Sequence, residues 1–119
     1  MTNEQPVQVS FAPAFQKDVK RLRKRYPRIQ QDIQPLIDQL EAGETPGDQV
    51  QGTGYTVYKV RLPNRDAQRG KSGGYRVIYY IQTLKQIMLL SVYAKSDRSN
   101  ISTGELQGII TDLPDDSDN

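Results

Sequence analysis

The fold is decided by three runs of aromatic and β-branched residues, YTVYKVRL at 55–62, YRVIYYI at 75–81 and IMLLSVYAK at 87–95. Such composition is typical of β-strands. Only a short turn separates the second run from the third, so we expect these two to form an antiparallel hairpin. The first two runs are joined by residues 63–74 (PNRDAQRGKSGG), which we interpret as a basic loop.

Side chains alternate between the two faces of a strand, and this period sorts the charges. In the third run it predicts Ser91, Tyr93 and Lys95 on one face and Met88, Leu90 and Val92 on the other. Each run therefore has one apolar face and one face with basic or phenolic groups. If the apolar faces pack on helices, the open face collects Lys59, Arg61, Arg76, Tyr80, Tyr93 and Lys95.

Helical patterns flank the strands. After a short alternating strand at 7–11, apolar residues recur at helical spacing over 13–26 and again over 29–40, where Pro35 is expected to kink or split the helix. Ser102 and Glu105 form a capping-box pattern before a last helix. The order β-α-α-β-β-β-α predicts an α+β fold with an antiparallel sheet and helices packed on one face. We expect a single domain over 1–113 and a disordered acidic tail over 114–119.

Composition excludes much chemistry. The 119 residues include no His, no Cys and no Trp. This removes Ser–His–Asp triads, Cys–His pairs, the usual zinc sites and disulfides. An enzyme of this composition must work with carboxylates, Lys, Arg, Tyr, Ser and Thr, and we expect it to need no metal or other cofactor. Residues 1–10 lack the pattern of a signal peptide and no apolar run could span a bilayer, so we expect a cytoplasmic protein.

The formal net charge of +2 hides a strong segregation along the chain. Residues 52–98 hold nine bases and two acids, whereas residues 112–119 hold four acids and no base. So many cations on one sheet face favour a polyanion as partner, with a solvated surface as the alternative. Tyr and Arg interleaved with Lys suit single-stranded RNA, whose bases stack on rings and guanidinium planes while cations hold phosphates.

Two motifs carry a family resemblance. The runs KSGGYRVIYY at 71–80 and LSVYAKSD at 90–97, together with Lys59-x-Arg61 on the preceding strand, resemble the RelE/ParE toxin superfamily, most closely its HigB-like branch. The similarity covers roughly residues 7–112. It implies the toxin of a type II toxin–antitoxin module, a metal-independent endoribonuclease that cleaves mRNA in the ribosomal A site and so inhibits translation. It also implies a cognate antitoxin as partner, in a hetero-oligomer bound to operator DNA.

The resemblance also implies roles for individual residues. The implied catalytic set is Lys59, Arg61, Lys71, Arg76, Tyr93 and Lys95. Arg76, with Lys59, Arg61 and Lys71, would stabilise charge on the scissile phosphate, and Tyr93 and Lys95 are candidates for stacking or proton transfer. The implied RNA-binding set is Arg65, Arg69, Tyr80, Asp97 and Arg98. Some members use a His or a C-terminal Tyr that this chain lacks, so the general base stays open.

Two other functions remain alternatives at this point. One is a ParE-like toxin that poisons DNA gyrase and cleaves nothing, although that branch tends to lack the cationic cluster. The other is a non-catalytic module that binds RNA or the ribosome, which would need the same basic face.

Overall fold

The computed structural model describes residues 6–67 and 74–114. Its elements, in chain order, are β1 (Gln8–Phe11), α1 (Pro13–Arg23), α2 (Ile29–Glu41), β2 (Asp48–Gln49), β3 (Val57–Leu62), β4 (Tyr75–Thr83), β5 (Gln86–Ala94) and α3 (Thr103–Thr111). The predicted α+β class and element order are confirmed, and a two-residue strand that was not predicted, β2, lies between α2 and β3. Residues 115–119, most of the predicted acidic tail, lie outside the described residues.

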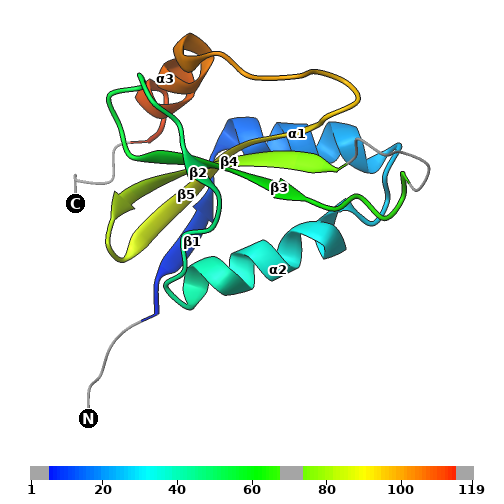
Figure 1. Ribbon diagram of the computed structural model, residues 1–119, viewed down its shortest axis with the longest axis horizontal. Coiled ribbons are helices and arrows are strands. Elements are labelled where there is room, and N and C mark those ends of the chain that lie inside the picture. The colour runs from blue at the N-terminus through cyan, green and yellow to red at the C-terminus, as the bar shows by residue number, and fades with distance from the viewer. Residues whose placement is uncertain (1–5, 68–73, 115–119) are drawn as a thin grey trace.

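The strands form one sheet in the order β1-β5-β4-β3-β2 (Figure 1). The pairs β3–β4 and β4–β5 are antiparallel, as predicted, β2 also pairs with β3 in antiparallel orientation, and β1 joins β5 in parallel. Because β1 ends at Phe11, no strand of the described residues lies beside the edge of β5 beyond Leu89. Asp18 of α1 covers part of that edge: its carboxylate accepts hydrogen bonds from the Val92 N–H at 3.1 Å and the Ser91 hydroxyl at 3.0 Å.

The helices divide between the two sides of the sheet. The ring of Tyr26, which follows α1, meets the ring of Tyr75 edge-on at 5.9 Å, and this contact places the α1–α2 pair against the face that carries Tyr75 and Val77. α3 lies on the other side of the sheet from α2 (Figure 1). The prediction that helices share one face therefore describes α1 and α2, and α3 is the exception. The reason is that the opposite face also holds an apolar residue, the fully buried Ile78, which needs cover.

A β-bulge changes the predicted register of β5. Ile78 pairs with Ser91, but Tyr79 pairs with Leu89, so one residue of β5 is extra at this point. As a result Met88 lies opposite Tyr80, on the same face as Ser91 and Tyr93. The prediction that Met88 lies on the opposite face was wrong, because strict alternation takes no account of an inserted residue.

Helix signals in the sequence are largely confirmed. The Ser102 hydroxyl accepts a hydrogen bond from the Glu105 N–H at 3.0 Å, and the Glu105 carboxylate accepts one from the Ser102 N–H, which completes the predicted capping box. Pro35 does not split its helix, since α2 runs unbroken from Ile29 to Glu41 with Pro35 on its exposed side. No helix in the described part of the chain is long and apolar enough to cross a membrane.

Candidate nucleic-acid interface

Three polar side chains lie side by side on β3, β4 and β5, near one end of the sheet, on the face opposite α1 and α2. Arg61 of β3 pairs directly with Arg76 of β4, and Arg76 pairs with Tyr93 of β5. Side chains of directly paired residues are neighbours about 5 Å apart at their Cβ atoms, and like charges so placed destabilise a sheet. The Arg61–Arg76 pair is therefore expected to destabilise the sheet, so a contribution to folding stability does not explain its presence.

Lys59 lies on the same face, two residues before Arg61. Its ammonium donates a hydrogen bond to the Asn100 side-chain oxygen at 3.2 Å, and this contact ties β3 to the segment that leads into α3. We call Lys59, Arg61 and Arg76 the cationic row. Within residues 6–67 and 74–114 none of the three forms an ion pair with an acid. The sequence pattern gave no signal for Asn100 as a partner.

Gly74 fixes the backbone at the start of β4, two residues before Arg76. Its φ of +96° is rarely adopted by residues with a side chain, and a Cβ at this position would overlap the carbonyl oxygen of Leu62. The Gly74 carbonyl accepts a hydrogen bond from the Lys95 N–H at 3.0 Å, which places half-buried Lys95 at the same end of the sheet. The glycine thus lets three strands meet closely where Arg61, Arg76 and Lys95 gather.

Tyr93 lies beneath this surface. The residue is only 2% exposed, and its buried hydroxyl makes no hydrogen bond within the described part of the chain. The Arg98 guanidinium covers the ring at 5.5 Å from its centre. Burial raises the pKa of the Tyr93 phenol, an effect opposed by the charges of Arg76 and Arg98. The phenol therefore stays protonated at neutral pH, and its ring is covered rather than open for stacking on a base.

Other predicted site residues take part in ion pairs. The Arg65 guanidinium contacts the Asp32 carboxylate at 2.5 Å, Asp97 contacts Arg25 at 2.9 Å, and Arg98 contacts Glu105 at 2.8 Å. A fourth pair joins Arg28 and Asp66 at 3.0 Å. We call these four pairs the ion-pair belt. In three of the four pairs the partners lie at least 33 residues apart in the sequence, and charge counts along the chain gave no sign of these pairs.

Three further predicted residues do not join the cationic row. Tyr80 shares its face but lies four residues beyond Arg76, roughly 13 Å along β4 at 3.3 Å per residue. There its ring meets the Tyr55 ring edge-on at 5.4 Å. Arg69 and Lys71, predicted to bind RNA and to take part in catalysis, lie outside the described residues.

The arrangement can stabilise negative charge. Guanidinium groups hold phosphate oxygens bidentately and an ammonium adds a point charge, so the cationic row is suited to a phosphodiester. In the described part of the chain no three acids gather as they would around a metal ion. The face therefore has the features of an interface for a nucleic-acid backbone.

The compact α+β fold with a cationic sheet face is consistent with a small nucleic-acid-binding protein, and sequence comparison identifies the family. The family model described as the RelE toxin of the RelE/RelB toxin–antitoxin system matches residues 15–111. The chain belongs to this RelE toxin family, and membership implies a cognate antitoxin as its partner. No curated protein sequence matches the chain.

Proposed function

We propose that this toxin is a ribosome-dependent endoribonuclease that cleaves mRNA in the ribosomal A site and thereby inhibits translation in the cytoplasm. The observation that carries the proposal is the Arg61–Arg76 pair, two like charges placed side by side on the sheet face opposite α1 and α2. A scissile phosphate between them would convert their mutual repulsion into shared attraction for an anion.

The proposed reaction is an internal transesterification. The ribose 2′ oxygen loses its proton and attacks the adjacent phosphorus, and the bond from phosphorus to the 5′ oxygen breaks. The products are a 2′,3′-cyclic phosphate and a 5′-OH, so one proton leaves and one is gained. Fixed positive charge at the phosphate stabilises the negative charge that develops, which is usually the largest single contribution to such catalysis.

Each residue of the face has a proposed task. Arg76, central in the row, binds the non-bridging oxygens of the phosphate, and Arg61 and Lys59 hold the backbone beside it. Lys95 donates the proton that the 5′ oxygen gains. Tyr93 acts from below, as a buried support for Arg76 and Arg98. Lys71, from the basic loop, is proposed to assist at the same phosphate.

The ion-pair belt has a different place in this proposal. Arg65, Asp97 and Arg98 are proposed to contact the RNA beside the row while they keep their ion pairs within the protein. Arg69 and Tyr80 are proposed as further contacts to the RNA. The antitoxin complex of the toxin is proposed to bind operator DNA.

The decisive experiment is Arg76→Ala in a translating extract, with mapping of mRNA 5′ ends. We expect cleavage to fall by about 100-fold or more, the usual cost of removing one donor to a developing oxyanion. Arg28→Ala, which removes an arginine from the ion-pair belt, is the matched control and should leave the cleavage rate nearly unchanged. Undiminished cleavage by Arg76→Ala would overturn the assignment. Ribosome binding by the wild-type protein without new 5′-OH ends would identify a non-catalytic binding module instead.

A further inference from the structure

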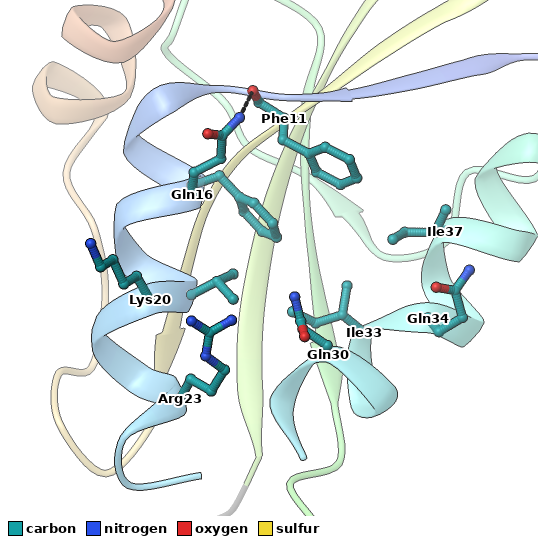
Figure 2. Close-up of a pocket in the computed structure, with 10 residues that line it drawn as sticks. Phe11, Gln16, Lys20, Arg23, Gln30, Ile33, Gln34 and Ile37 are labelled. Atoms are coloured by element: carbon teal, nitrogen blue, oxygen red, sulfur yellow. Dashed lines mark hydrogen bonds between the residues drawn. The ribbon is translucent and has the colours of Figure 1, made fainter. Parts of the chain in front are cut away.

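Lys59 of the cationic row is held in a way that an ordinary surface lysine is not. Figure 2 shows an ordinary case, Lys20 of α1, at the rim of the groove between α1 and α2. Lys20 is exposed, and within the described residues it makes no hydrogen bond or ion pair. Lys59 is half-buried, and its ammonium donates a hydrogen bond to the Asn100 side-chain oxygen at 3.2 Å. A lysine has a flexible four-carbon stem, so this contact restricts a charge that would otherwise adopt many positions.

Asn100 can hold Lys59 because its own backbone is anchored on both sides. Its carbonyl oxygen accepts a hydrogen bond from the Arg98 Nε at 2.9 Å, and the same guanidinium is paired with the Glu105 carboxylate at 2.8 Å. On the other side, Ile101 is only 7% exposed and belongs to the hydrophobic core. The Asn100 side chain therefore extends from a fixed segment towards the cationic row.

The chemistry of the partner preserves the charge of Lys59. An acid in this position would compensate the ammonium, as the acids of the ion-pair belt compensate their arginines. Asn100 offers a neutral amide, and its oxygen must face Lys59 because an ammonium can only donate hydrogen bonds. The contact uses one of the three ammonium hydrogens and cancels none of the positive charge. Lys59 is therefore both fixed in place and still fully charged for a phosphate.

We propose that Asn100 is a positioning residue, which acts through Lys59 by holding its ammonium where the RNA backbone binds beside the scissile phosphate. The inference rests on the proposed function, in which Lys59 holds that backbone. A cation that is already in place loses less side-chain freedom when RNA binds, and this favours binding.

The alternative is that the contact only stabilises the fold, by tying β3 to the segment before α3. The Lys59–Asn100 hydrogen bond is exposed, and water competes for both of its groups, so its contribution to folding is expected to be small. The two roles differ in whether an effect of Asn100 depends on the presence of Lys59.

The first test is single-turnover cleavage of mRNA on programmed ribosomes, measured over a range of ribosome concentrations. For Asn100→Ala we expect a half-saturating concentration about fivefold higher and a maximal rate within about twofold of the wild type, because a binding contact is weakened. Ser99→Ala, at the exposed neighbour of Asn100, is the matched control and should behave as the wild type. Lys59→Ala/Asn100→Ala should bind no more weakly than Lys59→Ala, since Asn100 then has nothing to position.

A second variant tests why the partner is an amide. Asn100→Asp keeps an acceptor oxygen beside Lys59 but adds a negative charge. It should raise the half-saturating concentration by at least about tenfold, more than Asn100→Ala does, because the added charge compensates Lys59 and repels the RNA. An affinity for ribosomes equal to that of the wild type would contradict the argument from charge.

The second test follows the Lys59 ammonium itself, by NMR of the lysine Nζ groups in the toxin without RNA. The protons of a hydrogen-bonded ammonium exchange with water more slowly, so the Lys59 signal should persist under conditions where that of Lys20 is lost. Lys59→Arg assigns the signal by removing it. Asn100→Ala should lose the signal as well, whereas Asn100→Asp and Ser99→Ala should keep it.

Three results would overturn the inference. They are wild-type half-saturation in Asn100→Ala, an equal loss from Asn100→Ala with and without Lys59, and a Lys59 signal that survives Asn100→Ala. The second of these would identify a purely structural role. Circular dichroism checks that each variant is folded. If the wild-type protein cleaves nothing, the proposed function fails, whereas the NMR signal still decides whether Asn100 holds Lys59.

Discussion

The cationic row and the ion-pair belt are built from the same residue types in two opposite settings. In the belt, the Arg65 guanidinium contacts the carboxylate of Asp32, whose side chain is only 1% exposed. In the row, Arg61 and Arg76 face each other with no acid within the described residues to separate them. The charges of the belt join chain segments, whereas those of the row have no acidic partner within the described residues.

The largest expected effect is a loss of stability when an arginine of the ion-pair belt is replaced. Arg65→Ala removes the partner of a buried carboxylate, and an uncompensated buried charge is strongly destabilising. We therefore expect the free energy of unfolding to fall by about 3 kcal/mol. Asp32 also accepts a hydrogen bond from the Arg65 N–H at 3.1 Å, which the variant retains. Urea denaturation followed by circular dichroism measures the change.

The matched variant for this prediction is Arg65→Ala/Asp32→Asn. Removing the buried charge together with its partner should recover part of the lost stability. If the double variant is as unstable as Arg65→Ala alone, the ion pair is not what holds this part of the belt together.

The next effect concerns the backbone that aligns the row. Gly74→Ala forces a side chain into a positive-φ conformation and against the carbonyl oxygen of Leu62. We expect a stability loss of about 2 kcal/mol, together with reduced cleavage, because Arg76 is displaced. Gly43→Ala is the control: its φ is +94° but a Cβ there meets nothing within 4 Å, so it should show the conformational cost alone. Equal losses in the two variants would contradict a special role for the Gly74–Leu62 approach.

Within the row itself, stability and activity should move in opposite directions. Arg61→Ala relieves the like-charge pair, so we expect a stability unchanged or higher by up to about 0.5 kcal/mol. Cleavage should fall about tenfold, equivalent to about 1.4 kcal/mol of transition-state stabilisation. Arg61→Lys, which keeps the charge, should recover much of the rate. A marked loss of stability in Arg61→Ala would place this residue with the belt instead.

Much of this fold follows from local patterns in the sequence. The three aromatic and β-branched runs became β3, β4 and β5, and the Ser102–Glu105 capping box begins the last helix as expected. The register of Met88 did not follow, because a bulge is a property of two strands together and leaves no mark on one. The side on which α3 packs is likewise decided by the whole sheet, since Ile78 needs cover that local spacing does not reveal.

For the candidate site, only the placement of its residues on one face of the sheet could be predicted from the sequence. Strand period correctly placed Arg61, Arg76 and Tyr93 together, because that rule depends on neighbours in sequence. It could not separate Arg65 from Arg61, which differ only in whether a distant acid such as Asp32 reaches them. Nor could it show that Tyr93 lies under Arg98, since burial depends on the segment that returns across the sheet.

The smallest effect is expected at the solvent-exposed Arg98–Glu105 pair of the ion-pair belt, and it depends on pH. The Ser102 N–H, followed by Arg98, lowers the pKa of Glu105 below its ordinary value of 4.5. A carboxylate with a lowered folded-state pKa adds stability above its unfolded pKa, and this stability is lost as pH falls through the folded value. Glu105→Gln can still reach back to the Ser102 N–H, so only the charge-dependent part is lost. For a side chain that is 50% exposed we expect about 0.5 kcal/mol at pH 7, fading to nothing well below pH 4.5.

Ser102→Ala removes the cap itself and should cost about 1 kcal/mol. Urea denaturation of both variants between pH 7 and pH 3 checks this, and a Glu105→Gln loss that persists at pH 3 would contradict it. Together with Arg65→Ala, these variants compare the stability contributions of two ion pairs of the same type. We expect the exposed Arg98–Glu105 pair to contribute little, because solvent screens its charges. The Arg65–Asp32 pair should contribute much more, because solvent is excluded from the buried Asp32 carboxylate.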